Sequence, residues 1–571
     1  MQPIQTLRLA AVTLMLTAGI PLLPMSDPLL PAVAQTVQDR QAEADRLLNQ
    51  GIQQLQTSQY QAALQSCQQA LAIYQAIKDR NGEAYALNNL GIAYFSLSQY
   101  TKAIEFYQQA LPIFRAVQDR NGEAKALNNL GIAYSSLSQS NKAIEFYQQA
   151  LPIFRAVQDR NGEARALNNL GIAYSSLSQY TKEIEFYQQA LPIFRAVGNR
   201  NGEASALNNL GNAYLSLSQY TQAIEFYQQA LPIFRAVQDR NGEAKALGGL
   251  GNAYFSLSKY NKAIEFYQQA LPIFRAVQDR NGEAKLLTGL GNAYGSLSQY
   301  NQAIEFYQQA LPIFRAVQDR NGEAKALNNL GSAYLSLSQY NQAIEFYQQA
   351  LPIYRAVQDR NGEANALVNL GVAYSSLSQY NKAIEFHQQA LSIFQAVQDR
   401  NGEAAALTNL GIAYSSLSQS NQAIEFHQQA LPIYRAVQDR NGEAKALNNL
   451  GLAYFSLSQY TKAIEFYQQA LPIYRAVQDR NGEARALNNL GIAYGSLSQY
   501  NKAIAFFKQA LPIFRAVQDR AGEGKLLSNI GVLLKEQKQP ELAIAFYKQS
   551  VNVRETIRKD LRKLSPDLQA S

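Results

Sequence analysis

The stretch NGEAKALNNLGIAYSSLSQSNKAIEFYQQALPIFRAVQDR, residues 121–160, is the unit from which nearly all of this 571-residue chain is built. Eleven close copies of it fill residues 81–520 with a period of 40 residues. A diverged copy precedes them at 41–80 and another follows at 521–560, which makes thirteen units. A fixed period between about 20 and 50 residues is typical of a solenoid, a propeller or another repeat array.

Two sets of apolar residues in each unit recur with steps of three and four residues. In the copy 81–120 the first set includes Leu87 and Leu90, and the second begins at Ala103 and ends at Val117. This spacing places each set on one face of a helix. Each unit is therefore predicted to contain a helix A, a short turn, a helix B and a second short turn. The whole chain is predicted to be all-α, a superhelical solenoid of thirteen helix-turn-helix repeats.

The residues before each helix indicate how its first turn is capped. Thr101, or the asparagine that replaces it in most copies, is a suitable N-cap for helix B. Asp119 or Asn121 is placed to cap helix A of the next unit. Both turns are therefore expected to be short and to carry their own caps.

Small residues occur where the two helices of a unit must approach closely. Gly91 on helix A and Ala103 on helix B belong to this set, and a larger side chain there would push the helix axes apart. One copy has Glu183 at the position of Ala103. This substitution indicates either drift at a tolerant position or a local distortion.

A proline lies inside helix B of ten copies. The prolines are at residues 112, 152, 192, 232, 272, 312, 352, 432, 472 and 512. An interior proline costs about 3 kcal/mol, because it lacks an N–H group and clashes with the carbonyl group four residues earlier. Apolar residues such as Phe114 and Val117 nevertheless continue the buried face beyond it. We therefore expect helix B to be kinked at the proline and not terminated there.

The composition argues against several classes of function. The net charge is +8, and the basic residues form no run of the kind that binds nucleic acid. The single cysteine, Cys67, permits neither a disulfide framework nor a cysteine-based metal site within one chain. No nucleic-acid partner is therefore expected.

The N-terminal residues differ from the repeats. Arg8 precedes an apolar run of about 15 residues, which is shorter than the ~20 residues of a membrane span, and small residues lead up to Ala34. This pattern indicates a signal peptide that is cut after Ala34, and an uncleaved anchor is the alternative. The predicted segments are a signal peptide at 1–34, a short segment at 35–40, the solenoid at 41–560 and a tail at 561–571. We expect an exported bacterial protein, periplasmic or extracellular, without a stable membrane span after cleavage.

The conserved positions of the unit form a known pattern. Helix A carries Leu87, Leu90, Gly91 and Tyr94, and helix B carries Ala103, Phe106, Tyr107 and Ala110 after Tyr100. This set resembles the tetratricopeptide repeat (TPR), over residues 41–560. The 40-residue period is similar to that of the Pins/LGN cell-polarity scaffolds and of kinesin light chains. The resemblance implies a superhelix in which helix A lines a concave surface that binds a protein or peptide, without catalysis or a cofactor.

The eleven close copies differ most at four positions of helix A, which are equivalent to residues 85, 88, 92 and 95. Spacings of 3, 4 and 3 residues place these positions on one stripe of the helix, away from the core. A recognition groove would vary between repeats in this way. Neutral drift at exposed positions would also produce this pattern.

Two residue types recur on this stripe and suggest its ligand. The position of residue 85 is Lys or Arg in seven copies, and the position of residue 89 is Asn in nine. An asparagine amide can pair with the C=O and N–H groups of an extended peptide, and a line of cations favours an acidic or phosphorylated partner. The candidate peptide-binding residues are Asn89, Lys125, Asn129, Arg165, Asn169, Asn209, Lys245, Lys285, Lys325, Asn329, Asn369, Asn409, Lys445, Asn449, Arg485 and Asn489. A solvated basic stripe with helix-stabilising asparagines is the alternative.

No combination of residues in the repeats suggests catalysis or metal binding. His387 and His427 replace a helix B tyrosine and lie 40 residues apart, too far for one metal ion. Glu83 and Glu105 recur through the units, which suits surface ion pairs better than catalysis. The end units are expected to cap the array with polar outer faces. An elongated structural or surface spacer without a groove ligand is the alternative function.

Overall fold

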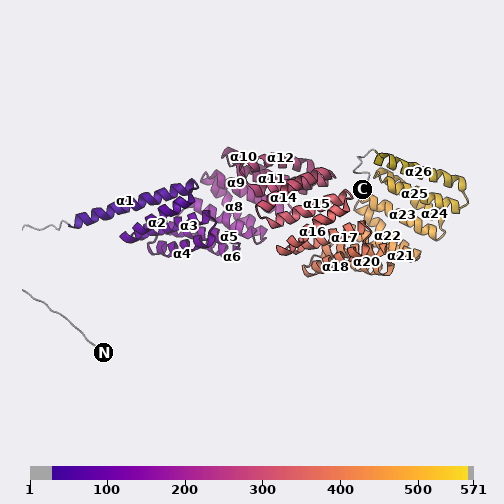
Figure 1. The fold of residues 1–571 in the computed structure, drawn as a ribbon, viewed down its shortest axis with the longest axis horizontal. Coiled ribbons are helices and arrows are strands. Elements are labelled where there is room, and N and C mark those ends of the chain that lie inside the picture. Colours follow the sequence, from indigo (N-terminus) through magenta and orange to yellow (C-terminus); the bar gives the residue numbers. More distant parts are fainter. Residues whose placement is uncertain (1–28, 563–571) are drawn as a thin grey trace, which may run out of the picture. The chain divides into compact units, whose positions relative to one another are not determined.

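The computed structural model describes residues 29–562, which form twenty-six helices and no strand (Figure 1). The predicted all-α array of helix pairs is therefore confirmed. The chain divides into two compact units, with the boundary between Ala213 and Tyr214. Most of the predicted signal peptide, 1–34, lies outside the described residues, as do the last nine residues of the chain, and the predicted segments stay predictions.

In the first unit helix A of each repeat is α1 (Leu29–Gln56), α3 (Arg80–Ser96), α5 (Arg120–Ser136), α7 (Arg160–Ser175) and α9 (Arg200–Ser216), whose end belongs to the second unit. Helix B is α2 (Tyr60–Ile77), α4 (Tyr100–Ala116), α6 (Ser140–Ala156) and α8 (Tyr180–Ala196).

In the second unit helix A of each repeat is α11 (Arg240–Ser256), α13 (Arg280–Ser296), α15 (Arg320–Ser336), α17 (Arg360–Ser376), α19 (Arg400–Ser416), α21 (Arg440–Ser456), α23 (Arg480–Ser496) and α25 (Arg520–Glu536). Helix B is α10 (Tyr220–Ala236), α12 (Tyr260–Ala276), α14 (Tyr300–Ala316), α16 (Tyr340–Ala356), α18 (Tyr380–Ala396), α20 (Ser420–Ala436), α22 (Tyr460–Ala476), α24 (Tyr500–Ala516) and α26 (Pro540–Arg562).

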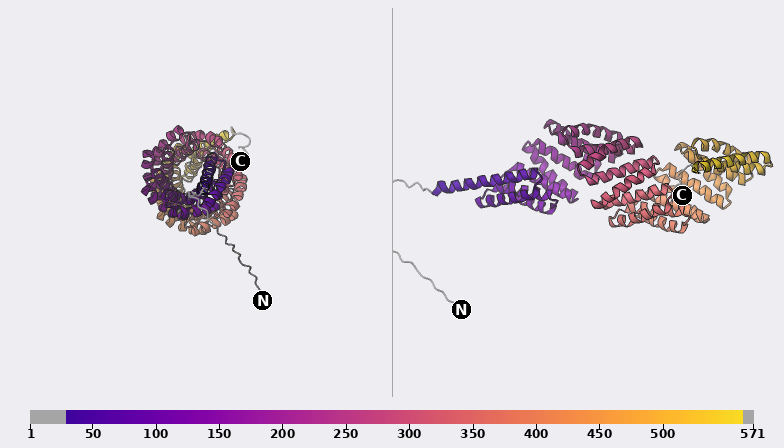
Figure 2. Two further views of the ribbon diagram at one scale, coloured as in Figure 1. Left: turned by 90° about the vertical axis from the view of Figure 1, so that its left-hand side faces the viewer. Right: turned by 45° about the horizontal axis from the view of Figure 1, so that its top comes forward.

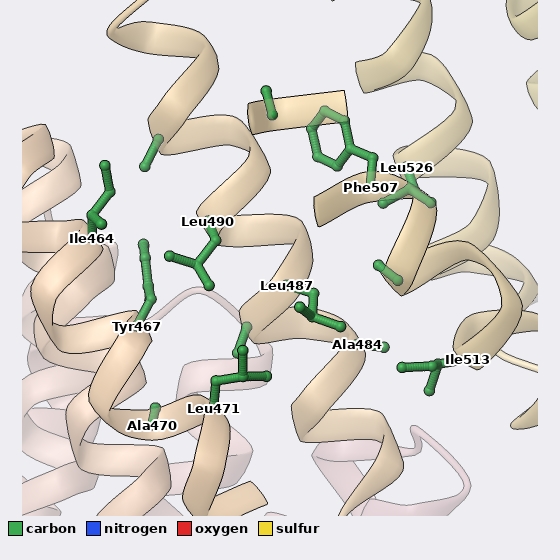
Figure 3. Close-up of a cluster of buried hydrophobic side chains, with 14 of the residues drawn as sticks. Ile464, Tyr467, Ala470, Leu471, Ala484, Leu487, Leu490, Phe507, Ile513 and Leu526 are labelled. Atoms are coloured by element: carbon green, nitrogen blue, oxygen red, sulfur yellow. The ribbon is translucent and has the colours of Figure 1, made fainter. Parts of the chain in front are cut away.

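Within each unit the helix pairs stack in chain order, so that a helix B packs against its own helix A and against helix A of the next repeat (Figure 2). The core is a continuous layer of apolar side chains between these helices. Figure 3 shows one part of it, in which Leu487 and Leu490 of α23 lie between Tyr467 of α22 and Phe507 of α24. Burial of this layer between neighbours is the main source of stability in such an array.

The two turns of a repeat are capped differently from each other. Asp119 accepts a hydrogen bond from the N–H group of Gly122 at 2.8 Å, which confirms the predicted cap of helix A. The predicted cap of helix B by Thr101 is wrong, because α4 already begins at Tyr100 and the preceding Gln99 makes no side-chain cap bond. The chain turns through a left-handed Ser98, so helix B starts at once and Thr101 lies inside its first turn.

The close approach of the two helices is confirmed at Gly91. A Cβ atom on Gly91 would lie 2.3 Å from Cε1 of the Tyr107 ring, which is far inside van der Waals contact. Ala103 is fully buried on the facing helix. The tyrosine ring of helix B therefore packs directly on the backbone of helix A.

The prolines do not end helix B. Helix α4 continues through Pro112 to Ala116. Helix α18, which has Ser392 at the equivalent position, has the same length of seventeen residues and ends at the equivalent residue. This continuation is confirmed, whereas the kink stays a prediction. Each proline lies on the exposed side of its helix, where solvent can reach the carbonyl group that it leaves without a helical partner.

The recurring glutamate of helix A is not a surface residue, which corrects the prediction. The Glu123 side chain is only 5% exposed and forms ion pairs with Arg115 and Arg120. Arg115 ends the preceding helix B, so this carboxylate joins successive repeats at their turn. Glu105, by contrast, is exposed, as predicted.

Glu183 distorts its repeat slightly, in agreement with the second of the two interpretations. It is 2% exposed, and its Oε2 atom has no hydrogen-bond partner. Helix α7, which packs against it, ends at Ser175, one residue earlier than its equivalents. Burial raises the pKa of the Glu183 carboxyl to about 7, although hydrogen bonds with Ser175 and Tyr187 oppose this shift.

The two ends of the array differ in polarity. Helix α1 exposes Arg46 and Gln50, where later repeats have a buried alanine and a buried leucine. On α26, Ile544 and Val551 are each 52% exposed, whereas the equivalent Ile104 is 7% exposed. The polar outer face that we expected is therefore present on the first repeat and not on α26. No helix among residues 29–562 has the length and apolar character needed to cross a membrane.

Candidate peptide-binding groove

The variable positions of helix A line similar cavities in both units. One cavity of about 430 Å³ lies between α3, α5 and α7, and another of about 400 Å³ lies one repeat further on, with Arg165 in both. A third of about 540 Å³ lies between α19, α21 and α23. We call these three the groove cavities. The sequence prediction of a stripe on helix A is thus matched by a hollowed surface at those positions.

Each groove cavity combines the same parts of three successive repeats. In the largest, Thr408 and Ile412 come from the first repeat, Lys445 and Asn449 from the second, and Arg485 from the third. The cavity is closed at its side by the aromatic rings at the end of helix B and by the first turn of the following helix A. Side chains of three different repeats thus meet at one cavity, although Thr408 and Arg485 are 77 residues apart in the sequence.

The cations of the predicted site are exposed, and four of them, Lys125, Arg165, Lys445 and Arg485, line the groove cavities. All seven side chains are exposed; they are Lys125, Arg165, Lys245, Lys285, Lys325, Lys445 and Arg485. Lys125 and Arg165 line the same cavity, together with Asp159. The two cations outnumber this one carboxylate, which also caps α7 by accepting a hydrogen bond from the N–H group of Gly162.

Several of the predicted asparagines donate a hydrogen bond to a different asparagine in the preceding repeat. Asn129 donates from Nδ2 to Oδ1 of Asn88 at 3.2 Å, and the same bond recurs one repeat further on between Asn169 and Asn128. Equivalent donors in other repeats are Asn209, Asn369 and Asn489, and Asn329 donates instead to Asn292 at 3.0 Å. This ladder joins successive helices A, whereas the sequence indicated only that the asparagines could stabilise a helix.

The asparagines still reach the groove in part. Asn129, Asn169, Asn209, Asn329, Asn369, Asn409, Asn449 and Asn489 are half-buried. Asn89 is buried and donates to the carbonyl oxygen of Tyr85, so it is the weakest of the candidates. A ladder bond uses one N–H group and one acceptor, and a carboxamide has further donor and acceptor capacity for a ligand.

Sequence reasoning missed three contributors to the cavities. They are the aromatic ring at the end of helix B, the capping aspartate, and the asparagine and glycine that begin the next helix A, as in Tyr474, Asp479, Asn481 and Gly482. These residues vary little between copies, so their pattern resembled that of core and turn positions. Burial raises the pKa of Tyr474 to about 12, so its phenol group is neutral at physiological pH.

The groove holds no candidate metal centre. Among the residues that the structure describes, no three His, Cys, Asp or Glu side chains gather in a way that could hold a metal ion. His387 and His427 are buried in place of the helix B tyrosine, against Gly371 and Gly411. Burial lowers the pKa of each to about 4, so both are neutral at physiological pH.

Stacked helix pairs, a glycine under an aromatic ring in each pair, and ligand-sized cavities along helix A define a helical-repeat solenoid of the protein-interaction class. A tetratricopeptide repeat family model matches residues 41–116, 122–196, 202–276, 282–356, 362–436 and 442–516, and a second tetratricopeptide repeat model matches 524–556. The chain belongs to the tetratricopeptide repeat family. This fold is a protein–protein interaction scaffold and is typically non-catalytic.

Solved structures resemble the chain in fold alone. The APC/C hetero-tetramer Cut9–Hcn1 is 16% identical with a TM-score of 0.45, and the match covers 89% of this chain and 93% of that chain. A Rap protein complexed with Competence and Sporulation Factor is 17% identical with a TM-score of 0.43, covering 62% and 99%. Aspartyl phosphate phosphatase F from Bacillus subtilis is 17% identical with a TM-score of 0.42, covering 62% and 93%. No curated protein sequence matches the chain significantly.

Proposed function

We propose that this protein is a non-catalytic scaffold that binds an acidic polypeptide segment along helix A of its repeats. The observation that carries the proposal is the recurrence of the groove cavities with the same build in different repeats. A polypeptide is itself periodic, and cavities of the same build in successive repeats, such as the two that share Arg165, suit a ligand that presents one residue after another. A compact small molecule would need only one of them.

The charge of the cavities supports an acidic ligand. Lys445 and Arg485 line one cavity together with a single aspartate, and Lys125 and Arg165 do so in another. The lysine and arginine side chains are exposed, so they can turn toward a carboxylate or phosphate group without losing an existing buried partner. Complementary charge of this kind speeds association and selects between partners more than it raises affinity.

We also propose that the protein acts outside the cytoplasm, after cleavage behind Ala34. The support is the apolar run and the small residues of the N-terminal sequence. Edman sequencing of the protein purified from its host tests this directly. A mature chain that begins at Gln35 supports the proposal, and a cytoplasmic chain that begins at Met1 contradicts it.

The binding proposal is tested with a phage-displayed library of random twelve-residue peptides. Selection on the mature chain at low salt is expected to enrich sequences rich in Asp and Glu, and their binding is expected to weaken as salt is raised, because exposed charges are screened. A selection without enrichment, or one that yields neutral or basic peptides, would contradict the proposed ligand. Absence of any enrichment would favour a spacer function, which needs no groove ligand.

A further inference from the structure

One repeat of the second unit lacks a side chain that its neighbours have. The position equivalent to residue 95 is large in α11 (Phe255) and in α15 (Leu335), but it is Gly295 in α13 between them. Glycine in a helix costs about 1 kcal/mol relative to alanine, so it needs a reason. Gly295 therefore marks a place where the stripe along helix A is interrupted.

Two repeats have glycine at the position equivalent to residue 95, namely Gly295 and Gly495. The space beside Gly295 is open, whereas the space beside Gly495 is filled. A Cβ atom on Gly495 would lie 2.8 Å from Cδ2 of Leu533, a leucine that replaces the alanine of other repeats and fills the gap. A Cβ atom on Gly295 would have nothing closer than Ala303 Cβ and Tyr307 Oη, both at 3.9 Å. Of these two glycines, only Gly295 has no neighbouring side chain that fills the space of the missing one.

The result is a cavity of about 430 Å³ that differs in build from the groove cavities. Phe255 and Tyr300 contribute aromatic surface, Asn292 and Ser332 contribute polar groups, and no charged side chain lines it. We call it the Gly295 notch. A neutral lining of mixed polarity suits an uncharged side chain and not a carboxylate.

The rest of the chain shows what kind of group fits there. Where the position of Gly295 is phenylalanine, the ring lies against the tyrosine that begins helix B. The ring centroids of Phe255 and Tyr260 are 5.4 Å apart with an interplanar angle of 58°, and those of Phe95 and Tyr100 are 5.2 Å apart at 53°. Within residues 29–562 no ring is paired with Tyr300, which begins helix B beside Gly295. An aromatic ring from a ligand would restore the missing pair.

The polar wall of the notch is held in place. The Tyr307 hydroxyl group donates to Oδ1 of Asn292 at 2.8 Å, and Nδ2 of Asn329 donates to the same oxygen at 3.0 Å. Two bonds from different helices fix the Asn292 side chain, so the notch is preformed. A preformed pocket requires less ordering when a ligand binds.

We propose that the Gly295 notch is a specificity pocket that takes one aromatic side chain of the bound polypeptide. The ring would lie where the Phe255 ring lies in its own repeat, against Tyr300. This inference rests on the proposed function, because the ligand is the same acidic polypeptide. It adds that the ligand carries an aromatic residue, Phe or Tyr, beside its acidic ones.

The test fills the notch with the residue that other repeats already have. Peptides enriched from the phage library on the wild-type chain are measured by fluorescence anisotropy against wild type, Gly295→Phe and a control, Gln389→Phe. The control places the same side chain at an exposed position of the helix B α18, outside the notch and away from the variable stripe of helix A. Thermal unfolding of all three chains shows whether each variant is folded.

We expect Gly295→Phe to be folded and to bind at least about tenfold more weakly, as for loss of a central aromatic anchor, while Gln389→Phe binds as wild type does. We also expect peptides selected on Gly295→Phe to have lost the aromatic residue. Equal affinity for wild type and Gly295→Phe, or an equal loss in both variants, would overturn the notch and leave the groove standing. No peptide binding by wild type would overturn the groove and the notch together.

Discussion

Glu323 forms an ion pair with Arg315 at 2.8 Å, although the two residues belong to successive repeats. Arg315 ends α14, Glu323 lies in the first turn of α15, and Arg320 pairs with the second oxygen of the same carboxylate. The carboxylate is 5% exposed, and it also lies at a helix N-terminus, where negative charge is favourable. This contact recurs along the array and fixes each repeat on the one before it.

Replacement of this buried carboxylate should weaken the array. Glu323→Gln is expected to lower the free energy of unfolding by about 2 kcal/mol, because two charge-assisted hydrogen bonds are lost. Chemical denaturation measures the change, and Glu345→Gln, at an exposed position of α16, is the control. The chain also contains a natural variant, since Gln395 stands where other repeats have this arginine and bonds to Glu403 at 3.2 Å. If both substitutions had the same effect, the contact would not join the repeats energetically.

Substitution by alanine at two glycines of α13 should change the stability of the chain in opposite directions. Gly291→Ala places a Cβ atom 2.4 Å from Cε1 of Tyr307 and is expected to destabilise the chain by about 1–3 kcal/mol. Gly295→Ala meets open space and is expected to stabilise it by about 0.5–1 kcal/mol, because alanine is the better helix former. Thermal unfolding separates the two. Stabilisation by both would show that the Tyr307 ring is free to move aside.

The buried Glu183 should make stability depend on pH. Its pKa is raised from an ordinary value of 4.5 to about 7, so between these values the folded chain binds the proton more tightly than the unfolded chain does. Its contribution to stability therefore falls as pH rises through this window and is lowest above about 7. Glu183→Ala restores the residue of the other repeats and should raise the unfolding temperature more at pH 8 than at pH 5. A pH-independent gain would contradict this account.

The buried histidines should produce the opposite slope. Burial lowers the pKa of His427 from 6.5 to about 4, so the unfolded chain binds the proton more tightly between these values. Stability is then lost as pH falls from about 6.5 to 4. Both ring nitrogens of His427 lack a hydrogen-bond partner, and His427→Phe should remove this acid sensitivity without loss of stability at pH 8. An unchanged acid limb of the stability curve would count against burial of the neutral ring.

The fold could be predicted because the forty-residue period and the apolar spacing repeat thirteen times, and each repeat is one local unit. The burial of Glu123 could not be predicted, because helical periodicity does not show that the turn between repeats places Arg115 of the preceding helix in contact with its carboxylate. The expectation that the variable stripe lies away from the core holds for the cations equivalent to residue 85, which are exposed. It is wrong for the position of residue 88, where Asn88, Asn208 and Thr408 are each only 8% exposed. The asparagine ladder could not be derived, because it joins Asn129 to Asn88 across the space between two repeats.

The central claim is that cations along helix A bind an acidic polypeptide, and charge reversal with a matched control tests it most directly. One variant carries as Glu the four cations that line the groove cavities, namely Lys125, Arg165, Lys445 and Arg485. The control reverses four exposed lysines at the start of helix B, which lie over tyrosine rings of helix A and line none of the three groove cavities, namely Lys142, Lys182, Lys382 and Lys462. Both variants change the net charge equally.

The measurement is the dissociation constant of an acidic peptide selected on the wild-type chain, obtained by isothermal titration calorimetry at low and at high salt. The account predicts that the first variant loses binding, while the control retains most of it and the small difference disappears at high salt. Equal weakening by the two variants would contradict it. The peptide would then respond to the overall charge of the protein and not to the groove.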